Sequence, residues 1–135
     1  MAIFSALNKY SNFGLLIMRA GLGTMMIIHG LPKITGGPEK WAKLGTAMAN
    51  MGIHFFPTGW GLAAAIAEAI GGVLVVLGLA FRPACLFIVM TMIVAATMHL
   101  SKGESLLDSS HAIELAFAFF GLMFMGPGKY SVDKG

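Results

Sequence analysis

Six ionisable residues stand in or at the ends of four stretches that are otherwise apolar enough for a lipid bilayer. They are Arg19, His29, Glu68, His99, His111 and Glu114. A charged side chain in hydrocarbon is costly, so such groups usually face a protein interior or a cavity and find partners there. These six residues are therefore the strongest indication of function in the sequence.

The composition indicates an integral membrane protein. Of 135 residues, 57% are hydrophobic and only 11% are charged, whereas a soluble domain carries about 25% charged residues. The net charge of +3 favours contact with anionic lipid headgroups. Lys and Arg are scattered and form no basic aromatic face, so nothing indicates a nucleic-acid partner. The expected partner is the lipid bilayer.

Four segments approach the roughly 20 apolar residues that a helix needs to span a bilayer core about 30 Å thick. They are residues 13–31, 59–81, 84–100 and 110–125. We therefore expect one transmembrane domain over residues 1–135, an all-α integral membrane four-helix bundle. The first span should end before Pro32, and a tight turn at residues 81–83 should join the second span to the third.

An even number of spans places the residues before the first span and after the fourth on one side of the membrane, called side A here. Loops 32–58 and 101–109 then lie on the opposite side, side B. Lys and Arg are divided equally between the two sides, so the positive-inside rule does not decide the orientation.

The first side-B loop contains apolar residues at helical spacing. Trp41, Leu44, Met48 and Met51 recur along residues 38–51. This pattern predicts a short amphipathic helix in the membrane interface, with Trp41 at headgroup level. A cap packed over the mouth of the bundle explains the same pattern, and the two interpretations are compatible.

Depth along the spans suggests a partner for each of the two deepest charges. At 1.5 Å per residue, Glu68 lies roughly 13 Å and Arg19 roughly 18 Å from side B. An Arg19–Glu68 ion pair is the simplest way to accommodate both charges. The pair could belong to an anion or headgroup site, or it could only fix the bundle, although a buried ion pair is weak evidence for stability.

The three histidines are predicted to lie nearer side B. His29, His99 and His111 stand at the side-B ends of three spans, and Glu114 follows His111 by three residues on the same helix face. If these faces point inward, they line one cavity with Glu68 at its floor. Taken singly, each histidine could equally be a hydrogen-bonded residue at a helix end.

Such a cavity suits proton-coupled binding of a quinone. Histidine titrates near neutral pH, and Glu68 could relay protons from deeper in the membrane. A metal site is the alternative, because ferritin-like bundles use Glu-x-x-His pairs. Here the order is reversed in residues 111–114 and occurs once, so we assign no metal ligands.

One stripe of small residues predicts close helix packing. Ala63, Ala67 and Gly71 follow one another at intervals of four, a spacing that lets helices in lipid approach closely. The stripe serves packing within the chain or a homodimer equally well.

Several short pieces of the sequence together resemble the DoxX family of small four-helix bacterial membrane proteins. The pieces are residues 16–19, 29–33, 67–72, 78–79 and 126–133, and the similarity extends over residues 15–133. The resemblance implies a multi-pass protein of the bacterial inner membrane that is associated with redox chemistry. Members resemble small subunits of a thiosulfate:quinone oxidoreductase, or partners of sulfurtransferases and superoxide dismutase in oxidative-stress complexes. Arg19, His29, Glu68 and residues 131–133 match the family pattern.

The sequence has no CxxC, CxxCH or GxGxxG motif, so electron transfer would need a bound quinone, an undetected metal or a partner subunit. Our leading hypothesis is a quinone-binding subunit of a redox complex, with Glu68, His99 and Glu114 as candidate catalytic residues. The candidate binding residues are Arg19, His29, Glu68, His99 and His111.

Two other functions remain open from the sequence. One is a non-catalytic membrane scaffold that recruits a peripheral enzyme through the side-B loops or residues 129–135. The other is a small transporter, although four helices are few for one and no discontinuous helix is evident.

Overall fold

The computed structural model describes residues 3–133, which form five α-helices, two short 3-10 helices and no strand. The α-helices are α1 (Ser11–Thr35), α2 (Gly37–Gly45), α3 (Pro57–Leu77), α4 (Phe81–Ser101) and α5 (Ser110–Met125). The 3-10 helices are η1 (Ser5–Tyr10) and η2 (Thr46–Met51). The predicted all-α class is confirmed for this part of the chain.

Three helical stretches are long and apolar enough to cross a membrane. They are η1 with α1 (Ser5–Thr35), α3 and α4. Helix α5 is apolar but has only 16 residues, which makes it about 24 Å long against a core of about 30 Å. Large apolar side chains such as Ile17, Phe87 and Phe117 stand exposed on the outside, as a lipid-facing surface requires and a soluble surface rarely allows. The chain is therefore a multi-pass membrane protein.

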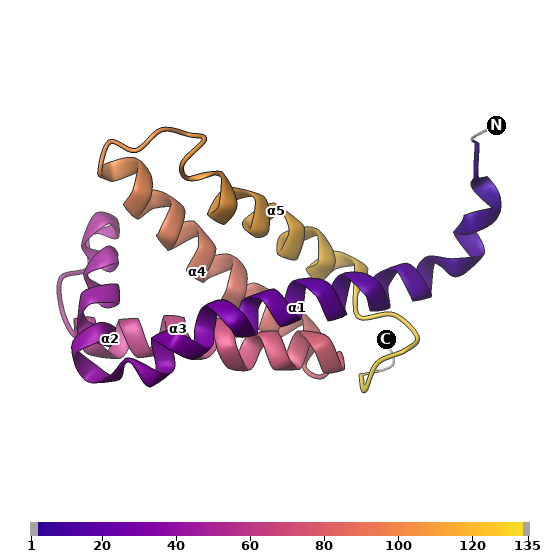
Figure 1. Ribbon diagram of the computed structural model, residues 1–135, viewed down its shortest axis with the longest axis horizontal. Coiled ribbons are helices and arrows are strands. Elements are labelled where there is room, and N and C mark those ends of the chain that lie inside the picture. Colours follow the sequence, from indigo (N-terminus) through magenta and orange to yellow (C-terminus); the bar gives the residue numbers. More distant parts are fainter. Residues whose placement is uncertain (1–2, 134–135) are drawn as a thin grey trace.

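The long helices form two antiparallel pairs, α1 with α3 and α4 with α5, and α3 also packs against α4 (Figure 1). Among the helices of the described chain, α5 approaches only α4 at close backbone distance. Buried apolar side chains from all four helices nevertheless share one core, for example Met26, Val75, Ile88 and Phe119. The backbones of α1 and α5 are therefore farther apart than those of the pairs α1–α3, α3–α4 and α4–α5.

Glycines set the contact between α1 and α3. A Cβ atom on Gly23 would lie 2.8 Å from the carbonyl oxygen of Gly72, and one on Gly72 would lie 2.7 Å from the carbonyl oxygen of Gly23. Two turns further along α1, Gly30 stands directly against the backbone of Ala69. In lipid, small residues permit this close approach, which here fixes the register of the two helices.

The predicted stripe of Ala63, Ala67 and Gly71 does not form this contact. Gly71 faces Ile88 of α4, while the two alanines line a groove between α3, α4 and η2. Gly71 therefore packs within the chain, whereas Ala63 is exposed and Ala67 is half-buried.

Helix α1 does not stop before Pro32, as the sequence predicts, but continues to Thr35 with Pro32 inside it. A proline removes one N–H donor and disfavours a helical conformation in the residue before it, but near the end of a helix only one hydrogen bond is lost. The helix instead ends at Gly36 and Gly37, where Gly37 has a positive φ of 82°. The extra turn carries Lys33 alongside α3.

The turn between α3 and α4 also differs from the prediction, because it precedes residues 81–83. Helix α3 ends at Gly78, with a φ of 68°, and α4 already begins at Phe81. The carboxylate of Asp133 accepts the N–H groups of Ala80 and Phe81 at 2.9 and 2.8 Å. A residue remote in sequence thus caps the start of α4, where a local N-cap residue would ordinarily stand.

The predicted amphipathic segment at residues 38–51 consists of α2 followed by η2, and α2 packs mainly against α3. Gly45 stands against the backbone of Pro57, and Gly61 stands against the backbone of Trp41. The indole N–H of Trp41 donates to the carbonyl of Lys33 at 2.9 Å. These contacts show a cap packed over the side-B end of the helices.

Candidate functional site

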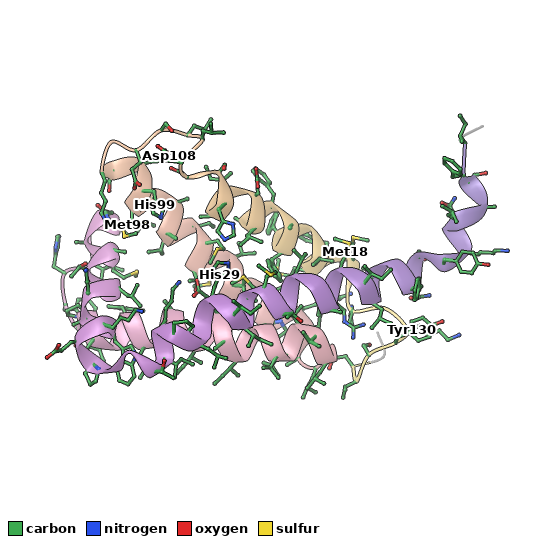
Figure 2. All side chains as sticks on the ribbon, viewed as in Figure 1. Met18, His29, Met98, His99, Asp108 and Tyr130 are labelled. Carbon is green, nitrogen blue, oxygen red and sulfur yellow. The ribbon has the colours of Figure 1, made fainter. Side chains whose placement is uncertain are left out.

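A polar cavity of about 140 Å³ lies at the side-B end of the molecule, between α1, α3, α4 and the start of α5. Its polar lining comes from these four helices and the loop before α5. The residues are His29, Lys33, Glu68, His99, Asp108, Ser109 and His111. Figure 2 labels three of them, His29 on α1, His99 on α4 and Asp108 in the loop. The cavity brings together four of the five binding residues predicted from the sequence.

At one wall of the cavity, the Nζ atom of Lys33 lies 2.5 Å from Oε2 of Glu68. The side chain of Glu68 is only 3% exposed and that of Lys33 is 30% exposed. The pair is possible because α1 continues past Pro32 and carries Lys33 across from α3. The sequence reasoning missed Lys33, although Met26, His29 and Lys33 recur at intervals of three and four, the spacing of one helix face.

Across the cavity, the imidazole rings of His29 and His111 lie 5.1 Å apart between centroids and are tilted by 55°. This contact links α1 to α5, which do not approach each other closely through their backbones. Residues 3–133 hold no group of three or more His, Cys, Asp or Glu side chains arranged to bind a metal ion.

At the cavity mouth, Nδ1 of His99 lies 2.6 Å from Oε2 of Glu104. His99 lines the cavity, whereas Glu104 does not. The sequence reasoning singled out His99 but not Glu104, because the loop that returns Glu104 to His99 has no strong sequence signal of its own.

Two residues near the start of α5 differ from expectation. Ser109 stands at the N-cap position of α5, where serine usually caps the helix, but its hydroxyl donates to the carbonyl of Ser105 at 3.0 Å, and α5 receives no side-chain cap. Glu114 is exposed and lies outside the polar cavity. Its candidate catalytic role therefore gains no support from the geometry.

The predicted Arg19–Glu68 pair is wrong. Arg19 is 1% exposed and donates only to main-chain carbonyls. Its Nε atom donates to Val75 and Nη2 to Val76, while Nη1 donates to both Pro127 and Tyr130, at distances of 2.8 to 3.1 Å. Because α1 ends later and α3 begins earlier than predicted, Arg19 lies more than a helical turn deeper than Glu68.

Arg19 therefore lies outside the polar cavity and serves another purpose. The orphan carbonyls at the end of α3 need donors, and the guanidinium supplies them while also holding residues 126–133. In the same segment the amide N–H of Lys129 donates to Oδ1 of Asn12 at 2.9 Å. We infer that Arg19 binds the protein's own backbone, which leaves little of its donor capacity for an anion.

A larger groove of about 380 Å³ runs between α4 and α5, but it is almost wholly apolar. Exposed Ile93, Phe117 and Phe120 line it, on helix faces other than those that carry His99 and His111 into the cavity. It offers no group for acid–base chemistry, so the smaller polar cavity is the candidate site.

Comparison with known protein families agrees with this architecture. The sequence model of the DoxX family matches residues 14–100, which is more than half of the chain. The chain belongs to the DoxX family. No curated protein and no solved structure gave a match.

Within this DoxX protein, the matched region contains Arg19, His29, Lys33, Glu68 and His99. It therefore covers α1, α3 and most of α4, and with them three of the four helical walls of the polar cavity. The matched region ends before Glu104, α5 and residues 126–133.

The DoxX cavity combines an ion pair, of which Glu68 is buried and Lys33 half-buried, with three imidazoles in a space of about 140 Å³. Binding pockets for whole drug-sized ligands measure roughly 300–1,000 Å³, so this space suits a single small polar group. Imidazoles both donate and accept hydrogen bonds and change charge near neutral pH. The arrangement can hold a polar headgroup and exchange protons with it.

Proposed function

We propose that this DoxX protein is a membrane subunit that binds a quinone, with the quinone headgroup held in the polar cavity. The observation that carries the proposal is the Lys33–Glu68 pair, nearly buried beside three histidines in a membrane protein. Ionisable groups placed this deep usually mark a binding or proton pathway. A quinone carbonyl is a hydrogen-bond acceptor that Lys33 and the imidazoles can serve.

The spacing of the helices supports an amphiphilic guest. Since α1 and α5 do not approach closely through their backbones, side chains bridge them at the cavity, among them the contacting rings of His29 and His111. A headgroup could enter there from the bilayer while its apolar tail stays in lipid. The wide spacing is a feature that a scaffold protein would not need.

In this proposal the membrane architecture is a four-helix bundle. Helix α5 supplies the fourth span, and local thinning of the bilayer or the flanking residues compensates for its short length. Helix α2 then lies at the interface on side B, above the cavity. The family suggests the bacterial inner membrane as location and a redox enzyme as partner subunit, and a partner would supply the electron-transfer group for which the sequence has no CxxC, CxxCH or GxGxxG motif.

The experiment is ligand binding by the whole protein, purified in mild detergent. Extracted lipids are analysed by mass spectrometry for quinone, and decylubiquinone is added while thermal unfolding is followed. We expect retained quinone and a higher unfolding temperature with decylubiquinone. Glu68→Gln should abolish the shift, whereas Glu39→Gln, the same charge change at an exposed residue of α2, should preserve it.

Absence of both retained quinone and a decylubiquinone shift would overturn the proposal. A shift that survives Glu68→Gln unchanged would place the guest elsewhere, for example in the apolar groove between α4 and α5.

A scaffold that recruits a peripheral enzyme is the second candidate, and one observation favours it. Apolar side chains on the side-B loops are strongly exposed, notably Phe55, Phe56, Leu106 and Leu107, at 68 to 81%. Exposed apolar patches of this kind mark protein or membrane contacts. This function predicts a copurifying protein that is lost when Leu106 and Leu107 are changed to Ser, and is kept in Glu68→Gln.

A further inference from the structure

The loop after α4 places His99 and Glu104 together through a specific turn. The amide N–H of Glu104 donates to the carbonyl of His99 at 3.2 Å, and that of Gly103 donates to Leu100 at 3.1 Å. Gly103 has a positive φ of 81°. This pair of hydrogen bonds around a left-handed glycine is the Schellman motif, in which the residues at the positions of His99 and Glu104 usually make an apolar contact.

The same chain contains the apolar version of this motif twice. At the end of α3, Leu79 donates to Leu74 and Gly78 to Val75. At the end of η2, Ile53 donates to Met48 and Gly52 to Ala49. In both turns the two contact positions hold apolar residues. The turn beside the cavity differs, because it puts an imidazole and a carboxylate where the others put two hydrocarbon side chains.

The His99–Glu104 contact determines which ring nitrogen carries a proton. An ionised carboxylate only accepts hydrogen bonds, so Nδ1 of His99, at 2.6 Å from Oε2, must be the protonated nitrogen. In the neutral ring Nε2 is then the acceptor. Because the ring lines the cavity and Glu104 does not, Nε2 is the nitrogen left for a guest. Carboxylate partners orient histidines in the same way at metal and catalytic sites.

We propose that Glu104 is a positioning residue that holds His99 with Nε2 free, so that His99 accepts the hydroxyl proton of a hydroquinone-type headgroup. The guest O–H bond breaks, an N–H bond forms at Nε2, the guest is left as its phenolate-type anion, and the imidazolium lies against the Glu104 carboxylate. No electron moves in this step. This inference rests on the proposed function and adds the reduced, hydroxyl-bearing form as the preferred guest.

Other ionisable groups surround His99 in the cavity. Lys33 and Glu68 form their pair, Asp108 adds a carboxylate, and His29 and His111 add two imidazoles. All of them contribute to any pH profile of binding. The test therefore measures the protonated nitrogen of His99 directly.

The first measurement is nitrogen NMR of ¹⁵N-histidine-labelled whole protein in nanodiscs, with the His99 signals assigned from His99→Gln. We expect Nδ1 protonated and Nε2 unprotonated in the free protein. Glu104→Gln should keep this tautomer, because an amide oxygen still accepts from Nδ1, whereas Glu104→Leu should lose it. Glu104→Leu places an apolar residue where the other two turns have Leu79 and Ile53, so it should fold as well as the natural chain.

The second measurement compares decylubiquinol with decylubiquinone as binding probes. Glu104→Leu should weaken decylubiquinol binding by about tenfold or more, the size of one charge-assisted hydrogen bond, and change decylubiquinone binding less than twofold. Glu39→Leu is the matched control and should change neither.

Each result decides a separate claim. If Glu104→Leu leaves the His99 tautomer unchanged, or weakens both probes equally, the positioning role is refuted. If the natural protein binds neither probe, the proposed quinone function is refuted together with the guest assigned here, and the NMR measurement still shows whether Glu104 positions His99.

Discussion

The Nη1 atom of Arg19 donates to the carbonyl oxygen of Pro127 at 2.9 Å, which joins two residues 108 positions apart in the chain. With its other three hydrogen bonds, Arg19 connects α1, the end of α3 and residues 126–133. The only charge fully buried at the side-A end of the described helices therefore compensates backbone dipoles and holds three segments together.

Replacement of Arg19 should reduce stability. Arg19→Met removes the donor of the Val76, Pro127 and Tyr130 carbonyls, while Val75 still accepts from Gly78. Each unsatisfied buried group costs about 1–3 kcal/mol, so we expect a loss of roughly 3 kcal/mol or more. Arg19→Lys keeps the charge but not the planar guanidinium, so its stability should lie between that of the natural protein and that of Arg19→Met. Unfolding by SDS titration measures the effect. Arg82→Met, at an exposed arginine, serves as control, and an equally large loss there would contradict the assignment.

Asp133 should be required for the start of α4. Its two carboxylate oxygens accept the N–H groups of Ala80 and Phe81, so Asp133→Ala should cost about 0.5–2 kcal/mol, as for other helix caps. Asp133→Asn keeps one acceptor and should cost less. Hydrogen exchange of the two amides is the direct measurement, and unchanged protection in Asp133→Ala would show that the cap does not act.

A pair of glycine variants tests the contact between α1 and α3. A Cβ at position 30 would overlap the backbone of Ala69, whereas Gly21 faces open space. Gly30→Ala should push α1 away from α3, lower the unfolding temperature and weaken decylubiquinone binding. Gly21→Ala should be neutral or stabilise by about 0.5–1 kcal/mol, because alanine restricts the unfolded chain more than glycine. Equal behaviour of the two variants would show that the helices do not pack at Gly30.

The Lys33–Glu68 pair should show strong coupling in a double-mutant cycle. Glu68→Gln leaves Lys33 without its counter-charge in a nearly buried site, which we expect to cost about 1–3 kcal/mol. Adding Lys33→Gln removes the unpaired charge and should recover part of that loss. Unfolding free energies of the two single variants and the double variant give the coupling. Strictly additive losses would mean that the two side chains do not interact.

The helices could be predicted from the sequence because apolar length and glycine stops act locally. Helix α5 ends at Met125, where the fourth span was predicted to end. Pro32 does not end α1, because a proline near the C-terminal end of a helix removes only one hydrogen bond. The clustering of His29, Glu68, His99 and His111 followed from their shared position near the side-B ends. Glu114 was expected to line the same cavity but does not, because the face of α5 that points inward could not be known until α5 had a neighbour.

The partners of the two buried charges could not be predicted in the same way. Arg19 binds main-chain carbonyls, and every residue has a carbonyl, so no residue type marks the acceptors. Glu68 binds Lys33, which a helix end at Pro32 would have placed in a loop. The register that separates Arg19 from Glu68 depends on contact between Gly23 and Gly72, and glycines occur throughout this sequence.

The acceptors of Arg19 also impose an order on biosynthesis. When α1 enters the membrane, none of its four carbonyl partners exists, because they belong to residues 75, 76, 127 and 130. At roughly 5–20 residues per second, the last of them follows Arg19 by several seconds or more. Throughout that interval the guanidinium must be satisfied by water, lipid phosphate or the insertion machinery. The native arrangement of α1 can therefore be completed only after residue 130 has been synthesised, so the final packing of α1 is a late step that follows its insertion into the membrane.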